Sequence, residues 1–197
     1  MSRFRIHFLM TALVASLGFA QKTGWNLDKA HSSIGFSIKH MVISDVTGNF
    51  KDYDVSFKSE KSDFTDATVD ASIKVASINT DNDKRDAHLR TDDFFNAEKF
   101  PLITFKSTSF EKVGENKYKI TGDLTIRDVT KKVTFDATYN GSIKAPWGAT
   151  IYSWKAVLSI NRFDYGLKWN KAIEAGGLIA GDTVNITLNL ELNKPSA

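Results

Sequence analysis

The chain has 197 residues, with no cysteine, 26 basic and 23 acidic residues, and a formal net charge of +3. The absence of cysteine excludes disulfides, thiol chemistry and zinc sites built on thiolates. Charges of both signs are interspersed, without the basic stripe that binds nucleic acid or an anionic membrane. The length, and the lack of a linker rich in proline, glycine or serine, indicate a single domain.

Residues 1–20 have the pattern of a secretory signal peptide. Two arginines precede an apolar run over residues 8–17 that is too short to span a bilayer, and small residues then predict cleavage before Gln21. Without the two leader arginines, the mature chain has 24 basic and 23 acidic residues, a net charge of about +1. We therefore expect an exported protein, periplasmic or secreted, whose folded domain covers residues 21–197.

The rest of the chain is dominated by short alternations of apolar and polar residues. Such alternation predicts half-buried β-strands, because successive side chains of a strand point to opposite faces. Eight segments of this kind follow one another, at residues 32–39, 46–57, 69–75, 103–109, 118–126, 133–139, 152–160 and 184–192. A change of phase within the second segment predicts a bulge or bend near Asp52. The pattern has no βαβ rhythm and indicates an antiparallel sandwich or a closed barrel.

One stretch, between the third and fourth segments, has a helical period instead. Ala87, Thr91 and Phe94 are spaced at i, i+4 and i+7, which predicts one inserted helix near residues 82–96 with an apolar stripe toward the sheet. Thr80 and Asp81 are the residues expected to cap the start of this helix. A single helix in an all-strand chain suggests a brace across one end of the sheet.

Small residues occupy several positions that the alternation places inside. Ala71, Gly122, Ala137 and Ala156 are in phase with large apolar neighbours. A barrel of about eight strands just accommodates its side chains or holds one small ligand. Small inward residues therefore either leave a cavity or face bulky side chains from neighbouring strands, and the pattern alone leaves both readings open.

Five sequence runs resemble the YceI-like family and cover nearly the whole mature chain in order. They are WNLDKAHSSIGFSIKH (25–40), RDAHLRTDDFFNAEKFPLITF (85–105), GDLTIRDVTKKV (122–133), INRFDYG (160–166) and GDTVNI (181–186). The resemblance implies an exported, eight-stranded antiparallel, lipocalin-like barrel with an apolar channel for polyisoprenoids, isoprenoid quinones or fatty-acid amides. Asp128 stands where the family usually turns on glycine, and Lys132 where proline is common.

The residues themselves show no catalytic or metal-binding motif. His31 and His40 are nine positions apart, so within one regular strand they would point to opposite faces. His88 is expected to anchor the helix, with Asp92 at i+4 as its partner. Arg85 either binds neighbouring backbone or meets the polar head of a ligand at the channel mouth, and the structural role is favoured. We expect no enzyme activity, no cofactor and no metal.

The predicted function is that of an exported binding or carrier protein holding a long apolar molecule inside the barrel. The expected channel-lining residues are Ile34, Phe36, Ile38, Ala71, Ile73, Phe94, Phe105, Leu124, Phe135, Ala137, Tyr139, Trp154, Leu158 and Leu188, with Arg85 and His88 at a polar mouth. A lipid-modifying enzyme using the same channel, or a ligand-free structural or stress-response barrel, are the alternatives. No nucleic-acid partner and no stable membrane insertion are expected, and a homodimer is left open.

Overall fold

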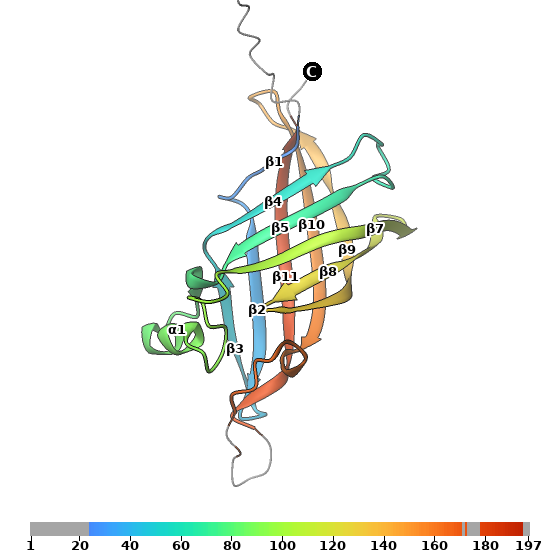
Figure 1. The fold of residues 1–197 in the computed structure, drawn as a ribbon. Coiled ribbons are helices and arrows are strands. Elements are labelled where there is room, and N and C mark those ends of the chain that lie inside the picture. Colours follow the sequence, from blue (N-terminus) through green and yellow to red (C-terminus); the bar gives the residue numbers. More distant parts are fainter. Residues whose placement is uncertain (1–23, 171, 173–177, 195–197) are drawn as a thin grey trace, which may run out of the picture.

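The computed structural model describes residues 24–170, 172 and 178–194, so the predicted leader and its cleavage site lie outside the described residues. Within them, eleven strands form one antiparallel sheet in the order β4-β5-β7-β8-β9-β10-β11-β2-β3-β6, with β1 paired to β11. Figure 1 shows this sheet curled around a common interior, with β4, β5 and β7 crossing in front of β2, β10 and β11. The predicted all-β, lipocalin-like architecture is confirmed.

The elements follow one another with a helix between β6 and β7. The strands are β1 Asn26–Leu27, β2 Ser33–His40, β3 Ser44–Phe50, β4 Tyr53–Lys58, β5 Thr68–Lys74, β6 Ile78–Asn79, β7 Leu102–Gly114, β8 Lys117–Ile126, β9 Val129–Lys144, β10 Thr150–Asn161 and β11 Ala180–Lys194. The helices are the 3₁₀ turn η1 Val75–Ser77, the α-helix α1 Asp83–Arg90 and the 3₁₀ turn η2 Arg162–Tyr165.

The described residues contain eleven strands rather than eight because some strands are short pieces. β1 and β6 have two residues each, and the predicted strand over residues 46–57 is divided into β3 and β4. Lys51 and Asp52 lie at this division, where the bend was predicted, and the Lys51 amide donates to the Ser77 carbonyl. β6 follows β5 after a single turn and pairs with the end of β3, which joins the two edges of the sheet.

The register of the long strands brings the predicted inward positions together. Ala156 of β10 lies opposite Ala137 of β9 on one side and Leu188 of β11 on the other. Phe105 of β7 lies opposite Leu124 of β8 in the same way. These residues belong to one continuous apolar cluster, either buried or packed against its buried members. The interior is therefore built from alternate residues of every long strand, as the period of two requires.

The helix is shorter than predicted. α1 covers Asp83–Arg90, and residues 91–99 form bends and turns. Asn82 is its N-cap rather than Thr80 or Asp81, because the Asn82 side chain accepts a hydrogen bond from the Arg85 amide at 3.0 Å. Over the described part of the chain, no helix has the length and apolarity needed to cross a bilayer.

The predicted apolar stripe is confirmed only in part, because Phe94 and Phe95 pack against the core while polar side chains also attach α1 to the barrel. Ala87 and Thr91 are exposed. Asp86 is buried, and its carboxylate accepts from the Thr80 amide at 2.9 Å and from the Thr80 hydroxyl at 2.5 Å. The Arg90 guanidinium donates to two backbone carbonyls of the segment that contains β6. A helical period in the sequence indicates which face of a helix is apolar. It does not indicate which polar side chains of the helix have buried partners.

The turn between β8 and β9 differs in detail from the expectation. The residue with positive φ is Arg127 (φ 57°) and not Asp128, which stands where the family usually turns on glycine. The Arg127 guanidinium donates to the Phe94 carbonyl and to the Asp92 carboxylate, each at 2.9 Å. These bonds hold the turn against the segment that follows α1.

Candidate binding cavities

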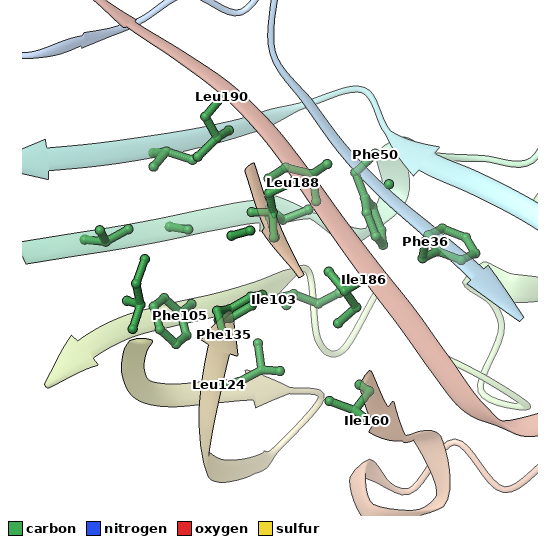
Figure 2. A pocket seen from close by; sticks show the side chains of 18 of the residues that line it. Phe36, Phe50, Ile103, Phe105, Leu124, Phe135, Ile160, Ile186, Leu188 and Leu190 are labelled. Atoms are coloured by element: carbon green, nitrogen blue, oxygen red, sulfur yellow. The ribbon is translucent and has the colours of Figure 1, made fainter. Parts of the chain in front are cut away.

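The curled sheet surrounds an inner cavity of about 140 Å³. Apart from Arg162 and the indole of Trp154, its walls are hydrocarbon side chains and one glycine. Figure 2 shows side chains converging on this space from β2, β3 and the long strands: Phe36, Phe50, Ile103, Phe105, Leu124, Phe135, Ile160, Ile186, Leu188 and Leu190. An apolar engineered cavity of about 150 Å³ stays dry and binds benzene. The inner cavity thus accommodates a short segment of hydrocarbon.

The small inward residues do not all contribute to this space. Ala71, Ala137 and Ala156 line the inner cavity. Gly122 does not, because the ring of Phe105 lies over it, and a Cβ atom at this position would stand 2.5 Å from that ring. Both alternatives therefore occur in the structure. The three alanines border a cavity, and the space at the glycine is filled by a bulky neighbouring side chain.

One end of the barrel is closed by an aromatic cluster. Phe64, buried in the loop over residues 59–67, lies at its centre. Its ring centroid is 5.0–6.3 Å from those of Trp25, Phe57, Tyr118, Tyr139, Tyr152 and Trp154. Phe57 and Trp154 also line the inner cavity, so this cluster forms its closed end.

The loop that carries Phe64 is held in place by Asp66. The Asp66 carboxylate accepts hydrogen bonds from the Ser59 hydroxyl at 2.7 Å and from the Glu60 amide at 2.9 Å. These bonds, the one from Ser59 first, lower the pKa of Asp66 to about 2. The Ser59 carbonyl in turn accepts from the indole of Trp25 at 3.1 Å, which ties the loop to the aromatic cluster.

A second, outer cavity of about 240 Å³ lies between α1, the β2–β3 hairpin and the segment that joins η2 to β11. Its walls combine apolar side chains with the polar residues Lys39, His40, Thr80, Arg85, His88 and Arg162. Among the residues described, no aspartate or glutamate lines it. The surface of the outer cavity is mainly apolar, with a small polar part that the inner cavity lacks.

Five residues line both cavities and form the boundary between them: Phe36, Phe95, Arg162, Leu167 and Val184. Phe36 pairs with Gly48 across β2 and β3. A Cβ at Gly48 would stand 2.5 Å from the Phe36 ring, so the glycine provides the space in which this ring lies. A molecule that occupies both cavities has to pass these side chains.

Arg162 is a buried cation at this boundary. Its guanidinium donates to the carbonyls of Gly181 at 2.7 Å, Trp169 at 2.9 Å and Ala180 at 3.1 Å, and also to that of Leu167. Burial lowers the pKa of Arg162. Carbonyls satisfy the donors without neutralising the charge, so Arg162 fixes the segment after η2 against the start of β11 and leaves a positive charge beside both cavities.

The two residues predicted for the polar mouth lie on the outer cavity with partners of their own. Arg85 donates from Nε to the Thr80 hydroxyl and from Nη2 to the Thr80 carbonyl, both at 2.7 Å, which agrees with the favoured structural role. His88 Nε2 lies 2.7 Å from Asp93 Oδ2, and the predicted partner Asp92 is bonded elsewhere. Both side chains are partly exposed, so they remain accessible from the cavity.

The structure places most of the predicted channel residues on one of the two cavities. Ile34, Phe36, Ala71, Ile73, Phe105, Leu124, Phe135, Ala137, Trp154 and Leu188 line the inner cavity, and Phe36, Ile38 and Phe94 line the outer one. Tyr139 and Leu158 line neither. Tyr139 packs in the aromatic cluster, and Leu158 lies beyond Val157, the last residue of β10 paired with β9, where it packs against the core.

Several cavity residues were not identified from the sequence. The sequence pattern could have identified Ile186 as a cavity residue, because Ile186 alternates in phase with Leu188. Arg162, Leu167 and Trp169 follow the last regular position of β10, where no period shows which way a side chain faces. Their role becomes visible only when η2 and the start of β11 are placed in space.

A group of potential metal ligands lies away from both cavities. The ligand atoms of Asp28, His31 and Glu191 are all within 4.8 Å of one another, a combination hidden in the sequence because Glu191 comes from the last strand. The Asp28 carboxylate already accepts from the Ala30 amide and approaches His31 Nδ1 at 3.0 Å. This hydrogen bond raises the pKa of His31. The arrangement orders a local turn, and we assign no metal to it.

Sequence comparison shows which proteins this barrel resembles. The model of the YceI-like domain matches residues 25–192. A UPF0312 protein of Staphylococcus aureus strain bovine RF122 is 40% identical over 172 residues, which cover 87% of this chain and 98% of that protein.

Solved structures agree with the sequence match. Burkholderia cenocepacia BcnA superimposes with a TM-score of 0.74 at 25% identity, over 84% of this chain and 99% of its own. The YceI protein of Campylobacter jejuni gives 0.69 at 37% identity, over 87% and 98%. A polyisoprenoid binding domain from Saccharophagus degradans gives 0.64 at 18% identity, over 88% and 100%, and shares the fold. From the family match and these similarities, we conclude that the chain belongs to the YceI-like family.

Proposed function

We propose that the protein binds one long apolar molecule, with its hydrocarbon chain in the inner cavity and its polar end in the outer cavity. The proposal rests on the observation that two cavities adjoin each other. The inner cavity is apolar, and the walls of the outer one include Lys39, His40, Arg85 and His88. The inner cavity alone holds only a short chain. Together the two reach the lower part of the range of about 300–1,000 Å³ that is typical of ligand sites.

A polyisoprenoid, an isoprenoid quinone or a fatty-acid amide fits this arrangement. In support, a domain of the same fold from Saccharophagus degradans is described as polyisoprenoid-binding. Each buried CH₂ group contributes about 0.8 kcal/mol, so an apolar tube achieves affinity with few polar contacts. The narrow boundary around Phe36 and Phe95 then selects ligands by girth, and the closed end behind Phe64 selects them by length.

We propose carriage rather than catalysis as the activity. General acid–base chemistry needs titratable groups within reach of a substrate proton. Among the described residues, Arg162 is the one ionisable group lining the inner cavity, and no carboxylate lines the outer one. Together with the predicted leader over residues 1–20, this favours an exported carrier that moves or sequesters an apolar molecule outside the cytoplasm.

Extraction of the purified mature protein with organic solvent, followed by mass spectrometry, tests the proposal. We expect one molecule of a chain-like lipid per barrel. Titration of delipidated protein with long-chain prenols, quinones and fatty amides should change the tryptophan emission saturably, since Trp154 lines the inner cavity and Trp169 the outer one. Trp154→Phe and Trp169→Phe then assign the change to one cavity. No saturable change with any of these compounds contradicts the proposal.

A further inference from the structure

The hairpin between β2 and β3 ends in three consecutive large apolar residues. Met41, Val42 and Ile43 have exposed fractions of 39%, 61% and 87%. We refer to these three residues as the hairpin tip. Isolated exposed apolar side chains are ordinary. Three in succession at the end of a protruding hairpin form a candidate interaction surface.

The backbone conformation of the hairpin tip favours other residues than the ones present. Met41 and Val42 both have positive φ, 49° and 69°, and the Ile43 amide donates to the His40 carbonyl at 3.3 Å. Two central residues with positive φ are typical of a type I′ turn, which strongly prefers Asn-Gly. A β-branched residue such as valine is a genuine outlier there. Local strain of this kind is commonly retained where it serves function.

The hairpin tip stands on the rim of the outer cavity. Lys39 and His40, the residues just before it, line that cavity. The Met41 amide donates to the carbonyl of Ile179 at 2.9 Å, and Ile179 lines the cavity from the side of β11. In Figure 1 the β2–β3 hairpin extends to the lower end of the molecule, whereas the β9–β10 turn lies at the upper end.

We propose that the hairpin tip inserts into the surface of a lipid bilayer and places the outer cavity against the membrane. This orientation, with the outer cavity facing the membrane, rests on the proposed function, because a carried apolar molecule could then pass between the bilayer and the cavity. A stable protein interface buries about 800 Å² on each partner, far more than three side chains offer. A short apolar tip, by contrast, supports only shallow and reversible insertion between headgroups, which is all that docking requires.

Polar groups directly behind the hairpin tip fit a position at the water–lipid boundary. Lys39 and Asp45 form an exposed ion pair at 3.0 Å, one on each strand of the hairpin. This ion pair limits insertion to the tip, because burying it among acyl chains is unfavourable. Since the inserted part carries no charge, docking should occur on neutral phosphatidylcholine vesicles. It should also persist at high salt and need no anionic lipid.

Flotation of the delipidated mature protein with phosphatidylcholine vesicles tests this proposal. We expect the wild-type protein to float with the vesicles, and Ile43→Ser to lower the partition coefficient by roughly tenfold or more. The double variant Met41→Asn/Val42→Gly installs the preferred turn sequence. It should therefore melt at a higher temperature while it binds vesicles less, and these opposite changes separate docking from folding.

Trp147 provides a matched control. It is 74% exposed in the turn before β10, and the twelve residues of that strand, roughly 40 Å, separate it from the outer cavity. Trp147→Ser should leave vesicle binding unchanged. Because the chain has no cysteine, Ile43→Cys and Trp147→Cys each create a single labelling site. A polarity-sensitive fluorophore should shift to the blue on vesicles at the first position only.

The outcomes separate this proposal from the proposed function. Vesicle binding that depends on the hairpin tip supports docking even if no ligand is ever found, in which case only the carrier function fails. If ligand does bind, Ile43→Ser should take it up normally from solvent and more slowly from vesicles. Docking is overturned if Ile43→Ser floats like the wild type. It is also overturned if light scattering shows a wild-type dimer that Ile43→Ser converts to a monomer, because the tip then joins two copies.

Discussion

Ala137 and Gly122 both face the barrel interior, and they have different effects on its volume. At Gly122 the missing side chain is replaced by the ring of Phe105, so nothing remains open. Ala137 is buried on the wall of the inner cavity, between Tyr118 of β8 and Ala156 of β10. A small residue produces a cavity only where the facing strands have no large side chain directed at it.

Ala137→Phe should therefore place an aromatic ring in the inner cavity. We expect the free energy of unfolding to change little or to rise, and ligand uptake to fall sharply, as measured by urea unfolding and by titration. In a filled interior the same substitution causes overpacking, which typically costs about 1–3 kcal/mol. Lys155→Phe adds the same ring on the exposed face of β10 and should leave uptake unchanged. Clear destabilisation of the ligand-free Ala137→Phe protein would contradict the cavity.

Asp66 should make the stability of the protein depend on pH in the acid range. Its pKa is lowered from 3.8 to about 2 in the folded chain, so its contribution is complete above about pH 4 and is lost as the pH falls toward 2. Asp66→Ala should accordingly be less stable than the wild type at pH 6, and the difference should shrink between pH 4 and pH 2. Urea unfolding at several pH values measures this. A difference that is constant over this range would contradict the assignment.

At the scale of elements, α1 is attached by specific polar contacts in addition to the packing of Leu89 against the core. Asp86 and Arg85 both bind Thr80, and Arg90 binds carbonyls of the β6 segment. Such contacts define one position of a helix strongly, because a buried polar group has few alternative partners. The helix thereby holds His88 and Leu89 on the wall of the outer cavity.

Asp86→Ala should loosen this attachment. The substitution leaves the Thr80 amide and hydroxyl without their acceptor in a buried position, and an unsatisfied buried group costs about 1–3 kcal/mol. We expect a loss of this size in urea unfolding, together with faster amide hydrogen exchange throughout α1. Asp83→Ala removes an exposed acidic residue from the same first turn and should cost less, about 0.3–1 kcal/mol through the helix dipole. Equal losses in the two variants would argue against the attachment.

At the scale of the whole molecule, the two ends of the barrel differ. One end is closed by the aromatic cluster around Phe64, and the other carries the outer cavity, α1 and the hairpin tip. Under the proposed function, we expect an apolar molecule to enter and leave at the end that carries the outer cavity. The inner cavity would then hold its hydrocarbon chain, and the few polar groups of the outer cavity would lie at its end.

Phe64→Ala should open the closed end. Removing a buried phenylalanine typically costs about 3–5 kcal/mol, and Phe64 contacts six other rings. We expect a loss of this size in urea unfolding and a weaker discrimination between long and short ligands, because Phe57 and Trp154, which line the inner cavity, lose the ring that packs against them. Trp147→Ala, on the exposed turn, should change stability by no more than about 0.5 kcal/mol. A Phe64→Ala protein of normal stability would show that the cluster does not close the barrel.

The sequence by itself determined the all-β class, the single helix between the third and fourth strand segments, and the face on which most strand residues lie. This follows from the period of two, which assigns each side chain to one side of a sheet. Ile34, Ala137 and Leu188 were therefore placed inside correctly, and the family resemblance added the curled, lipocalin-like form.

Only the tertiary structure decided where along the barrel each inward residue lies and what meets it there. Tyr139 has the same phase as Ala137, yet it packs on Phe64, which comes from a loop with no period of its own. Arg162 acquires its role from carbonyls of Trp169, Ala180 and other residues that irregular segments bring together. A period specifies direction but not depth, and contacts between distant segments arise only when the chain folds.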